Sequence, residues 1–479
     1  MKIAGLLSLL LLVSTGCSSV KSAPETFEEI SILTEKKLGE RIIWNNDEKA
    51  AKEIELAIDK LLEKPLSVAD VVQIALLNSP ALQAVYEEVG VAQADLVQAG
   101  LLQNPTFLIE RRFPGKSLEL DLAQNFIDLL FIPLRTRIAE NYLEATKLKV
   151  AAAVLEHAAK TKEAFYELQA SLQRLEMRRA VSKAMSASAL AAAKIYKAGN
   201  IIELEMQNEQ NLANEARVEL ADAENEVIQS REHLNIVLGL WNQRINWTIN
   251  ERLPNVPASD PDGRGLERLA INERLDLQAE RRELDALGSN INLSGYGAML
   301  TEAVLGFHSE REPGGDRSGG PSLEIPIPIF NQGEPQRARA AALFRQKASQ
   351  FMQHAVEIRS EVRRAFTTMR TARKKAAYYQ REILPLQAKM LQQTQLQYNG
   401  MFKSVFELLQ AKKKQIDAAE EFIDALKDYW MSRTELELAV GGQIKDVPMT
   451  EQAAVQSSVT IYPSTTNSTH SHHQGKHHE

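Results

Sequence analysis

Several features that compact domains and enzymes depend on are scarce in this sequence. Aromatic residues make up 6% of its 479 residues, it has a single cysteine, and its net charge is −7. A single cysteine excludes an internal disulfide, and basic residues interleaved with acidic ones give no support for nucleic-acid binding. The sequence also has no phosphate-binding glycine loop, no His-Glu-x-x-His and no serine nucleophile motif, so we expect no enzyme and no cofactor.

A short apolar run near the N-terminus stops at the one cysteine. Lys2 precedes the run at 6–13, which is too short to span a bilayer, and Ser14-Thr15-Gly16 leads directly to Cys17. This arrangement resembles a bacterial lipoprotein signal, which predicts removal of residues 1–16 and acylation of Cys17. A plain secretory signal with an incidental cysteine is the alternative.

The first half of the mature chain predicts a helix, a strand pair and a long helical hairpin. Residues 17–65 are expected to be a lead segment, mostly extended, with a helical piece at about 46–62. A first unit at 66–247 follows, and it begins with a helix from Ser67 to about Gly100 that is interrupted at Pro80. A strictly alternating strand at 118–122 has its expected partner strand at 107–111. A long helix at 133–198 and a returning helix at 201–238 complete the unit. A linker rich in Pro, Asp and Gly occupies 248–265.

The same plan repeats after the linker, in a second unit at 266–441. We expect a helix at 266–287, an apolar segment at 290–307, a Gly-rich loop at 310–320, a strand at 322–325 and a long helix at 336–397. That helix would be roughly 90 Å long. Asn399-Gly400 predicts a left-handed turn, and Ser404 is the expected N-cap of the returning helix. The preceding short helix of each unit is expected to stack end to end on the shorter returning helix.

The strands set a further condition. Two strands in each unit give four in one chain, and a four-stranded sheet has two open edges that lipid cannot satisfy. Several chains would therefore have to complete a barrel, and three chains give an even count that suits outer-membrane barrels. Pro326 and Pro328 are expected at a strand end or beyond it, because proline cannot serve in a central ladder.

The order of these elements and several motifs resemble the TolC family of outer-membrane efflux proteins over about 66–440. Ile325-Pro326-Ile327-Pro328-Ile329-Phe330-Asn331-Gln332-Gly333 is similar to the family's signature before its long helix, and Ile383-Leu384-Pro385 and 398–411 are similar to its second hairpin. Arg274-Leu275-Asp276-Leu277 follows the family's Arg-Pro-Asp-Leu with one departure, and Phe126 to Leu134 lacks the family's Pro-Phe-Asn form.

The resemblance implies a mainly helical fold with a small membrane β-barrel. Its members would form a homotrimer, with a twelve-helix tunnel of long hairpins continuous with a twelve-stranded barrel. The chain would act in the bacterial outer membrane, lipid-anchored and extending into the periplasm, as the exit duct of a tripartite pump. Its partners would be outer-membrane lipid, a periplasmic adaptor and an inner-membrane transporter of the RND type.

Gate residues are also implied by the resemblance. They are Tyr398, Lys403, Glu407 and Gln410 at the second hairpin tip, with Glu203 and Glu205 as weaker candidates at the first. Three copies of Glu407 around a pore would attract cations, whereas the alternative is a solvated helical acid. His157, His233, His308 and His354 are isolated in the sequence and indicate no metal site.

The tail at 442–479 is rich in Ser, Thr and His and is typical of disorder. Its last residues include the candidate metal ligands His470, His472, His473, His477 and His478. This tract favours heavy-metal cations as the exported substrate, with drugs or solvents as the alternative. Two further functions stay open: a lipid-anchored periplasmic scaffold built on coiled coils, and a periplasmic metal buffer.

Overall fold

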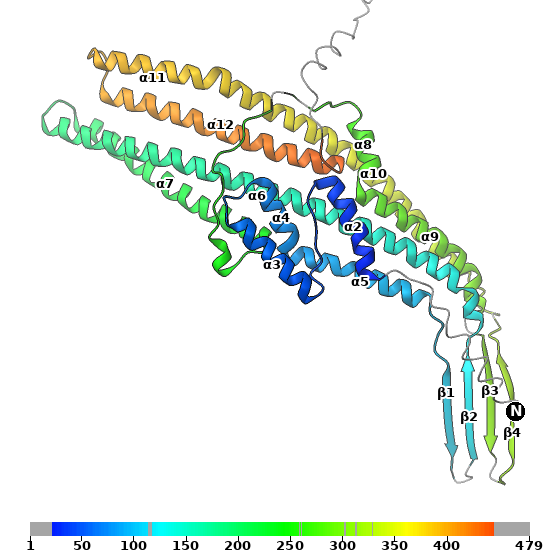
Figure 1. Cartoon of the computed structure of the whole chain (residues 1–479). Coiled ribbons are helices and arrows are strands. Elements are labelled where there is room, and N and C mark those ends of the chain that lie inside the picture. Colours follow the sequence, from blue (N-terminus) through cyan, green and yellow to red (C-terminus); the bar gives the residue numbers. More distant parts are fainter. Residues whose placement is uncertain are drawn as a thin grey trace, which may run out of the picture.

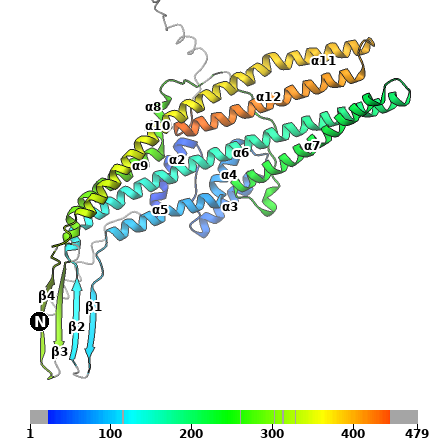
Figure 2. The same cartoon turned by 180° about the vertical axis from the view of Figure 1, so that it is seen from behind.

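The computed structural model describes residues 22–113, 117–257, 259, 261–300, 303–311, 314–327 and 329–444. Long helices run side by side in an elongated body that has a four-stranded sheet at one end and two hairpin tips at the other (Figure 1). Seen from behind, the strands continue the body beyond the helices (Figure 2). Cys17, Pro328 and the five tail histidines, His470, His472, His473, His477 and His478, lie outside the described residues.

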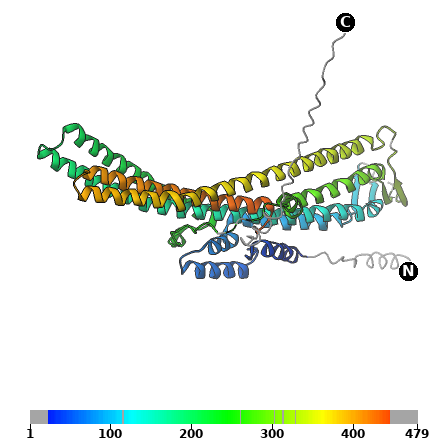
Figure 3. The ribbon, with the colours of Figure 1, turned by 90° about the horizontal axis from the view of Figure 1, so that it is seen from above.

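Two N-terminal helices lie against one side of the layer of long helices (Figure 3). They are α2 (Ala23–Leu38) and α3 (Glu48–Leu62). The expected helical piece at 46–62 is confirmed, but the mostly extended conformation expected before it is wrong. Ser22 and Glu25 form a capping box at the start of α2, and Phe27, Ile30 and Thr34 bury one face of it, a helical spacing that the sequence reading overlooked.

The first series of elements follows the predicted order. It contains α4 (Val68–Asn78), α5 (Pro80–Ala99), β1 (Thr106–Arg112), β2 (Ser117–Gln124), η2 (Ile127–Leu130), α6 (Ile132–Lys197), α7 (Glu203–Leu238) and η3 (Asn242–Ile245). The break at Pro80 is confirmed. Pro80 is the first residue of α5, a position whose N–H has no partner within the helix, so the lack of an N–H in proline costs no hydrogen bond. Helix α6 is central, since α5, α7, α9 and α12 all pack against it.

The second series repeats the first with different breaks. It contains α8 (Leu266–Glu273), α9 (Leu275–Leu300), β3 (Val304–Arg311), β4 (Arg317–Glu324), α10 (Glu334–Tyr378), η4 (Tyr379–Ile383), α11 (Leu384–Asn399) and α12 (Val405–Val440). The expected helix at 266–287 is broken at Arg274 and continues to Leu300. The expected loop at 310–320 is largely strand. The glycine-rich β4 has little strand preference of its own, and its backbone hydrogen bonds with β3 hold it in the sheet. Pro326 lies beyond β4, as predicted.

The long helix of the second series is continuous from Glu334 to Asn399, as long as α6, with one irregular turn. That turn, η4, has π-helical hydrogen bonding and ends two residues before Pro385. Proline has no N–H to donate to the carbonyl four residues earlier, so the chain widens locally instead of breaking.

The predicted end-to-end stacking of short helices is confirmed at two joints. At the first, Asn78 Nδ2 donates to the carbonyl oxygens of Leu238 and Gly239 at 2.9 and 2.8 Å. Gly239 has φ +66, and a Cβ there would lie 2.7 Å from the Asn78 carbonyl oxygen. At the second joint, Gly441 has φ +87 and a Cβ would lie 3.0 Å from the Glu273 backbone. Each returning helix therefore ends in a left-handed glycine that touches the next helix start.

None of the described helices is by itself long and apolar enough to cross a membrane, although α4 and α5, bent by 51° between them, meet that test as a pair.

The four strands form one antiparallel sheet in the order β1-β2-β3-β4. β2 pairs with β3, so this pairing joins the two series, and the register sets Leu122 opposite Phe307 and Asp121 opposite His308. The first strand pair agrees with the prediction at 107–111 and 118–122. Strands β1 and β4 are the sheet's edges, each with one neighbour.

Candidate functional site

The second hairpin tip turns through a Schellman motif. Phe402 N donates to the Gln397 carbonyl oxygen and Met401 N to the Tyr398 carbonyl oxygen, both at 2.9 Å. The left-handed residue is Met401, with φ +62, whereas Gly400 has φ −82. The prediction of a left-handed turn at Asn399-Gly400 is therefore wrong by one position. A Cβ at Gly400 would lie 3.0 Å from the ring of Phe402, and this exposed ring would have to shift to accommodate it.

The first tip uses the same motif with the expected residue. Asn200 N donates to the Ile195 carbonyl oxygen at 3.1 Å and Gly199 N to the Tyr196 carbonyl oxygen at 2.8 Å. Gly199 takes the left-handed conformation with φ +75, so it occupies the position that Met401 fills at the second tip. A non-glycine residue in this conformation costs on the order of 1–3 kcal/mol, so the second tip is strained where the first is not.

A capping box starts the returning helix at the second tip, and Glu407 is part of it. Ser404 Oγ accepts from Glu407 N at 3.3 Å, and Ser404 N donates to Glu407 Oε2 at 2.9 Å, which confirms the predicted N-cap. Lys403 Nζ donates to Glu407 Oε1 at 2.8 Å. The hydrogen bond from Lys403, followed by the one from Ser404 N, lowers the pKa of the exposed Glu407 carboxyl.

The proposed gate residues are thus only partly brought together within one chain. Lys403 and Glu407 contact each other, and among the described residues no hydrogen bond or ion pair joins Tyr398 or Gln410 to them. Glu203 and Glu205 lie in the first turn of α7, where Gln207 Nε2 donates to Glu203 Oε1 at 3.1 Å. Both tips lie at the end of the molecule opposite the strands (Figure 1).

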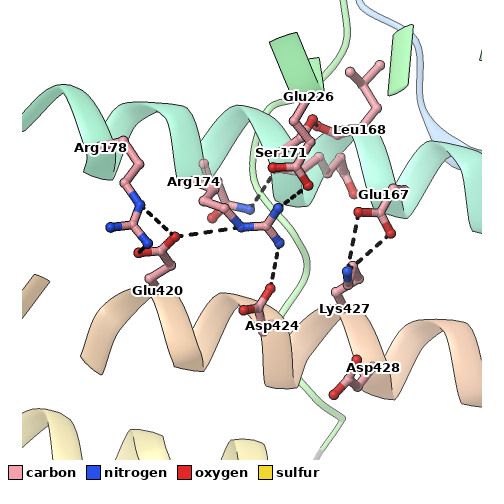
Figure 4. A network of polar contacts seen from close by, with 12 residues as sticks. Glu167, Leu168, Ser171, Arg174, Arg178, Glu226, Glu420, Asp424, Lys427 and Asp428 are labelled. Carbon is pink, nitrogen blue, oxygen red and sulfur yellow. Dashed lines mark hydrogen bonds and ion pairs between the residues drawn. The ribbon is translucent and has the colours of Figure 1, made fainter. Parts of the chain in front are cut away.

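Two arginines of α6 join both hairpins through a network of ion pairs (Figure 4). Arg174 binds Glu226 of α7, and its Nη2 donates to Asp424 Oδ1 of α12 at 2.6 Å. Arg178 Nη2 lies 3.0 Å from Glu420 Oε2 of α12, and its Nη1 donates to Glu219 of α7 at 2.7 Å. The two arginines therefore hold α7 and α12 on either side of α6.

The charges in this network are shifted by burial and by one another. Burial alone would lower the pKa of the Arg174 guanidinium, but hydrogen bonds with Glu226 and Asp424 outweigh it and raise the pKa. Burial raises the pKa of the Glu420 carboxyl, and the charges of Arg178 and Arg174 oppose that rise. Arg174 thus stays cationic, and removing it would leave the carboxylates without their main partner.

Arg274, which the sequence analysis names, and Lys37, which it does not, both lie at the second helix joint. Arg274 Nη2 donates to Asp276 Oδ2 at 2.7 Å and Nη1 to Glu361 of α10 at 2.6 Å, so this motif fixes the start of α9. Lys37 of α2 donates to the Gly441 carbonyl oxygen at 2.9 Å and to the Glu273 carboxylate at 3.0 Å. The family-like Arg274 was noticed in sequence, whereas nothing local to Lys37 indicates a contact with the C-terminus of α12.

The sheet has one apolar and one polar face. Directly paired residues share a face, so the register places Phe107, Ile109, Leu118, Leu120, Leu122, Leu305, Phe307, Pro321 and Leu323 on the apolar one. Arg111, Arg311 and Arg317 lie on the same face, next to Leu118 at the end of the sheet away from the helices. Most of these side chains are exposed in the single chain. The opposite face carries Glu110, Glu119, Asp121, His308, Glu310, Ser322 and Glu324. The alternation predicted for 118–122 therefore extends through most of the sheet, with Leu108 on the polar face as an exception.

Residues 266–442 match the family model described as "Outer membrane efflux protein". The match covers the second series of elements, from α8 to the end of α12. The second series of elements is therefore that of an outer membrane efflux protein. Members of this TolC-like family are efflux proteins of the bacterial outer membrane and not enzymes, in agreement with the absence of catalytic motifs from the sequence.

Solved structures of outer-membrane channels share the fold of the chain. CmeC of Campylobacter jejuni is 14% identical with a TM-score of 0.66, over 85% of this chain and 90% of that chain. CusC is 16% identical with a TM-score of 0.62, over 78% and 92%. The open state of MtrE from Neisseria gonorrhoeae is 15% identical with a TM-score of 0.61, over 78% and 89%. No curated protein matches the sequence.

The arginine network yields a stability prediction for this efflux protein. Arg174→Gln should destabilise the fold by about 1–3 kcal/mol, because it leaves buried or half-buried carboxylates of α7 and α12 without a cationic partner. Thermal unfolding of the detergent-solubilised protein measures the change.

Arg179→Gln is the matched control, since Arg179 lies on the same helix, is exposed and pairs with Glu224 only at 3.9 Å. We expect this control to stay within about 0.5 kcal/mol of the parent. Equal losses in both variants would mean that the network does not hold the hairpins together.

Proposed function

We propose that three copies of this chain assemble into a passive exit duct, with their strands forming a barrel in the outer membrane and their hairpins a tunnel through the periplasm. The single observation that carries this proposal is a sheet with one exposed apolar face and two open edges. In hydrocarbon, each unpaired backbone N–H or C=O group of an edge strand costs several kcal/mol. Only closure of the sheet into a barrel gives all of these groups a partner.

Trimeric closure also suits the polar face. In a closed barrel the apolar side chains face lipid and the polar ones the interior, as in outer-membrane barrels generally. We infer that the chain is built of two TolC-like units, 66–247 and 266–441, and that each contributes two strands and one hairpin. A periplasmic scaffold would use the long hairpins as well, but it gives no role to the exposed apolar face.

The hairpin tips are the proposed periplasmic entrance, where an adaptor and an RND-type transporter would dock. Met401 and Phe402 are 94% and 86% exposed at the second tip, which provides an apolar contact at the far end of the molecule. The proposed gate comprises Tyr398, Lys403, Glu407 and Gln410, with Glu203 and Glu205 at the first tip. Heavy-metal cations are the proposed substrate class on the basis of the tail histidines, with drugs or solvents as the alternative.

Assembly is tested by the mass of the full-length protein in mild detergent. Light scattering should give a particle with three chains, each of about the 53.5 kDa of the sequence. A stable monomer would contradict the duct.

Two neighbouring residues of β4 provide a matched pair for the barrel itself. Leu323 lies on the apolar face and Ser322 on the polar one, and both are exposed. Leu323 is the second-last residue of β4, near the rim of the apolar band, so Leu323→Arg should disfavour membrane insertion by about 1 kcal/mol, whereas Ser322→Arg should insert normally. The same yield of inserted trimer for both variants would show that the apolar face does not face lipid.

The gate proposal predicts how ion selectivity responds to charge at the second tip. Glu407→Gln should reduce cation preference in planar-bilayer recordings, because three carboxylates around an axis attract cations. Glutamine keeps the capping box with Ser404, so the change removes charge without uncapping α12. Glu435→Gln, at the other end of α12, is the control and should leave selectivity as in the parent.

Lys403 provides an opposite test at the same tip. Because Lys403 and Glu407 are paired at 2.8 Å, Lys403→Ala should unmask the carboxylate and raise cation preference, in addition to raising resting conductance if it helps to close the tip. Unchanged conductance and selectivity in both tip variants would exclude these residues from the gate while leaving the duct architecture in place.

We also propose a lipid anchor at Cys17. The thiol of this residue is the chain's one candidate for thioether acylation, so the mature protein should begin at Cys17 and carry the added mass of acyl chains. Intact-mass spectrometry of protein purified from membranes checks this, with Cys17→Ser as the control. A parent protein without added acyl mass would contradict the lipid anchor, and the sheet would then be what attaches the chain to the membrane.

A further inference from the structure

The polar face of the sheet gathers four ionisable side chains at the centre of the β2 and β3 pair. Asp121 is directly opposite His308, and Glu119 is directly opposite Glu310. Asp121 and His308 are 187 residues apart in the sequence, so strand pairing alone brings them together. All four side chains are partly buried, with exposed fractions between 18% and 35%.

Three of these side chains converge on one point. His308 Nδ1 lies 2.6 Å from Asp121 Oδ1 and 3.7 Å from Glu119 Oε1. Among the residues that the structure describes, Glu119, Asp121 and His308 are the one group of three or more potential ligands whose donor atoms all lie within 4.8 Å of one another. The other ring nitrogen, His308 Nε2, points towards Glu310 Oε2 at 4.0 Å.

We propose that Glu119, Asp121 and His308 bind a divalent transition-metal ion such as Zn²⁺ on the polar face of the strands. One imidazole and two carboxylates favour ions of this class over Mg²⁺ and Ca²⁺, which prefer sites made of oxygen alone. Three protein ligands also leave a coordination position for water or for a fourth ligand. The site is thus built to hold an ion and to remain accessible from the polar side.

The distances require only a small adjustment. Ligands 2.0–2.2 Å from a tetrahedral Zn²⁺ are about 3.3 Å from one another. The pair at 2.6 Å would open and the pair at 3.7 Å would close, each by less than about 1 Å, which rotations of these side chains accommodate. Rigid strands hold the three Cα positions while this happens.

Glu310 completes the arrangement from behind the histidine. For Nδ1 to bind a metal it must carry a lone pair, so the imidazole proton would reside on Nε2. Glu310 Oε2 is 4.0 Å from that nitrogen and is the carboxylate that would accept its N–H. A carboxylate behind a metal-bound histidine fixes the ring and increases its basicity as a ligand.

A second histidine shows what distinguishes the site from an ordinary ion pair. His354 of α10 also lies between two carboxylates, at 3.5 Å from Asp276 and 3.3 Å from Glu280. Asp276, however, is held by Arg274, whose cation occupies the carboxylate. His354 is therefore a matched control: it also lies between carboxylates, but among the described residues it belongs to no group of three close ligands.

The inference rests on the proposed duct only for its location, since a closed barrel would place the ions inside the lumen, one for each chain. The test uses full-length protein in detergent in which the five tail histidines are replaced by serine, because they would compete for metal. Isothermal titration with Zn²⁺ alone, repeated with Mg²⁺ present, gives the affinity and the number of ions per chain. Co²⁺ absorption supplies a second readout of the ligand set.

We expect one Zn²⁺ per chain, with Mg²⁺ unable to displace it and Co²⁺ absorption typical of mixed nitrogen and oxygen ligands. His308→Asn and Asp121→Asn should each weaken Zn²⁺ binding at least about tenfold, and Glu310→Gln should weaken it less than either. His354→Gln should bind as the parent does. Asp121→Asn and Glu310→Gln keep polar side chains of similar size, so the test does not depend on one variant folding.

The outcomes separate this site from the duct. A trimer that binds no Zn²⁺, or whose binding is the same in His308→Asn, overturns the metal site and leaves the duct standing. A monomer that still binds one Zn²⁺ through His308 supports the site and contradicts the trimeric duct. Loss of binding in His354→Gln but not in His308→Asn would also overturn the site.

Discussion

The close backbone contact at Gly239 allows two shorter helices to cover one long helix. Helix α6 has 66 residues and its returning partner α7 has 36, so part of α6 would be exposed without α5 continuing the line of α7. Gly441 makes the corresponding contact between α12 and α9. The strands depend on the same joints, because α5 and α9 lead directly into β1 and β3. A side chain at either glycine would push the sheet and the hairpins out of line.

Packing along the body relies on small residues and charges because large aromatic side chains are few. Buried alanines of α6, such as Ala151, Ala158 and Ala170, permit the helices to approach closely. Alanine interfaces specify register weakly, since one small residue fits much as another does. Arg174 and Arg178 add directional contacts that are satisfied in one register of α7 and α12 against α6. Breaking such contacts is costly even where their net contribution to stability is small.

The sequence predicted most of the fold wherever one local signal dominated. The long helices, the break at Pro80, the Ser404 cap and the alternating strand at 118–122 all depend on neighbouring residues, and all are present. The α2 helix was missed because Thr26, Ser31 and Thr34, three of its five buried residues, are polar and weaken the apolar period. The strands β3 and β4 were shortened because their glycines indicate a loop in isolation. The contact of His308 with Asp121 could not be predicted, because it depends on pairing between strands from the two halves of the chain.

The two hairpin tips differ in how their turns are stabilised, and the difference gives the second tip its character. At the first tip Gly199 takes the left-handed conformation at no steric cost. Met401 takes it at the second tip, where the capping box of Ser404 and Glu407 and the pair with Lys403 hold the returning helix. Glu407 therefore has two roles that compete for one carboxylate. The hydrogen bond that its carboxylate accepts from Ser404 N stabilises a strained turn. The negative charge of the same carboxylate acts on its surroundings only when Lys403 does not neutralise it. A partner that drew Lys403 away would raise the negative charge of the tip without uncoiling it, since the bond from Ser404 N would remain.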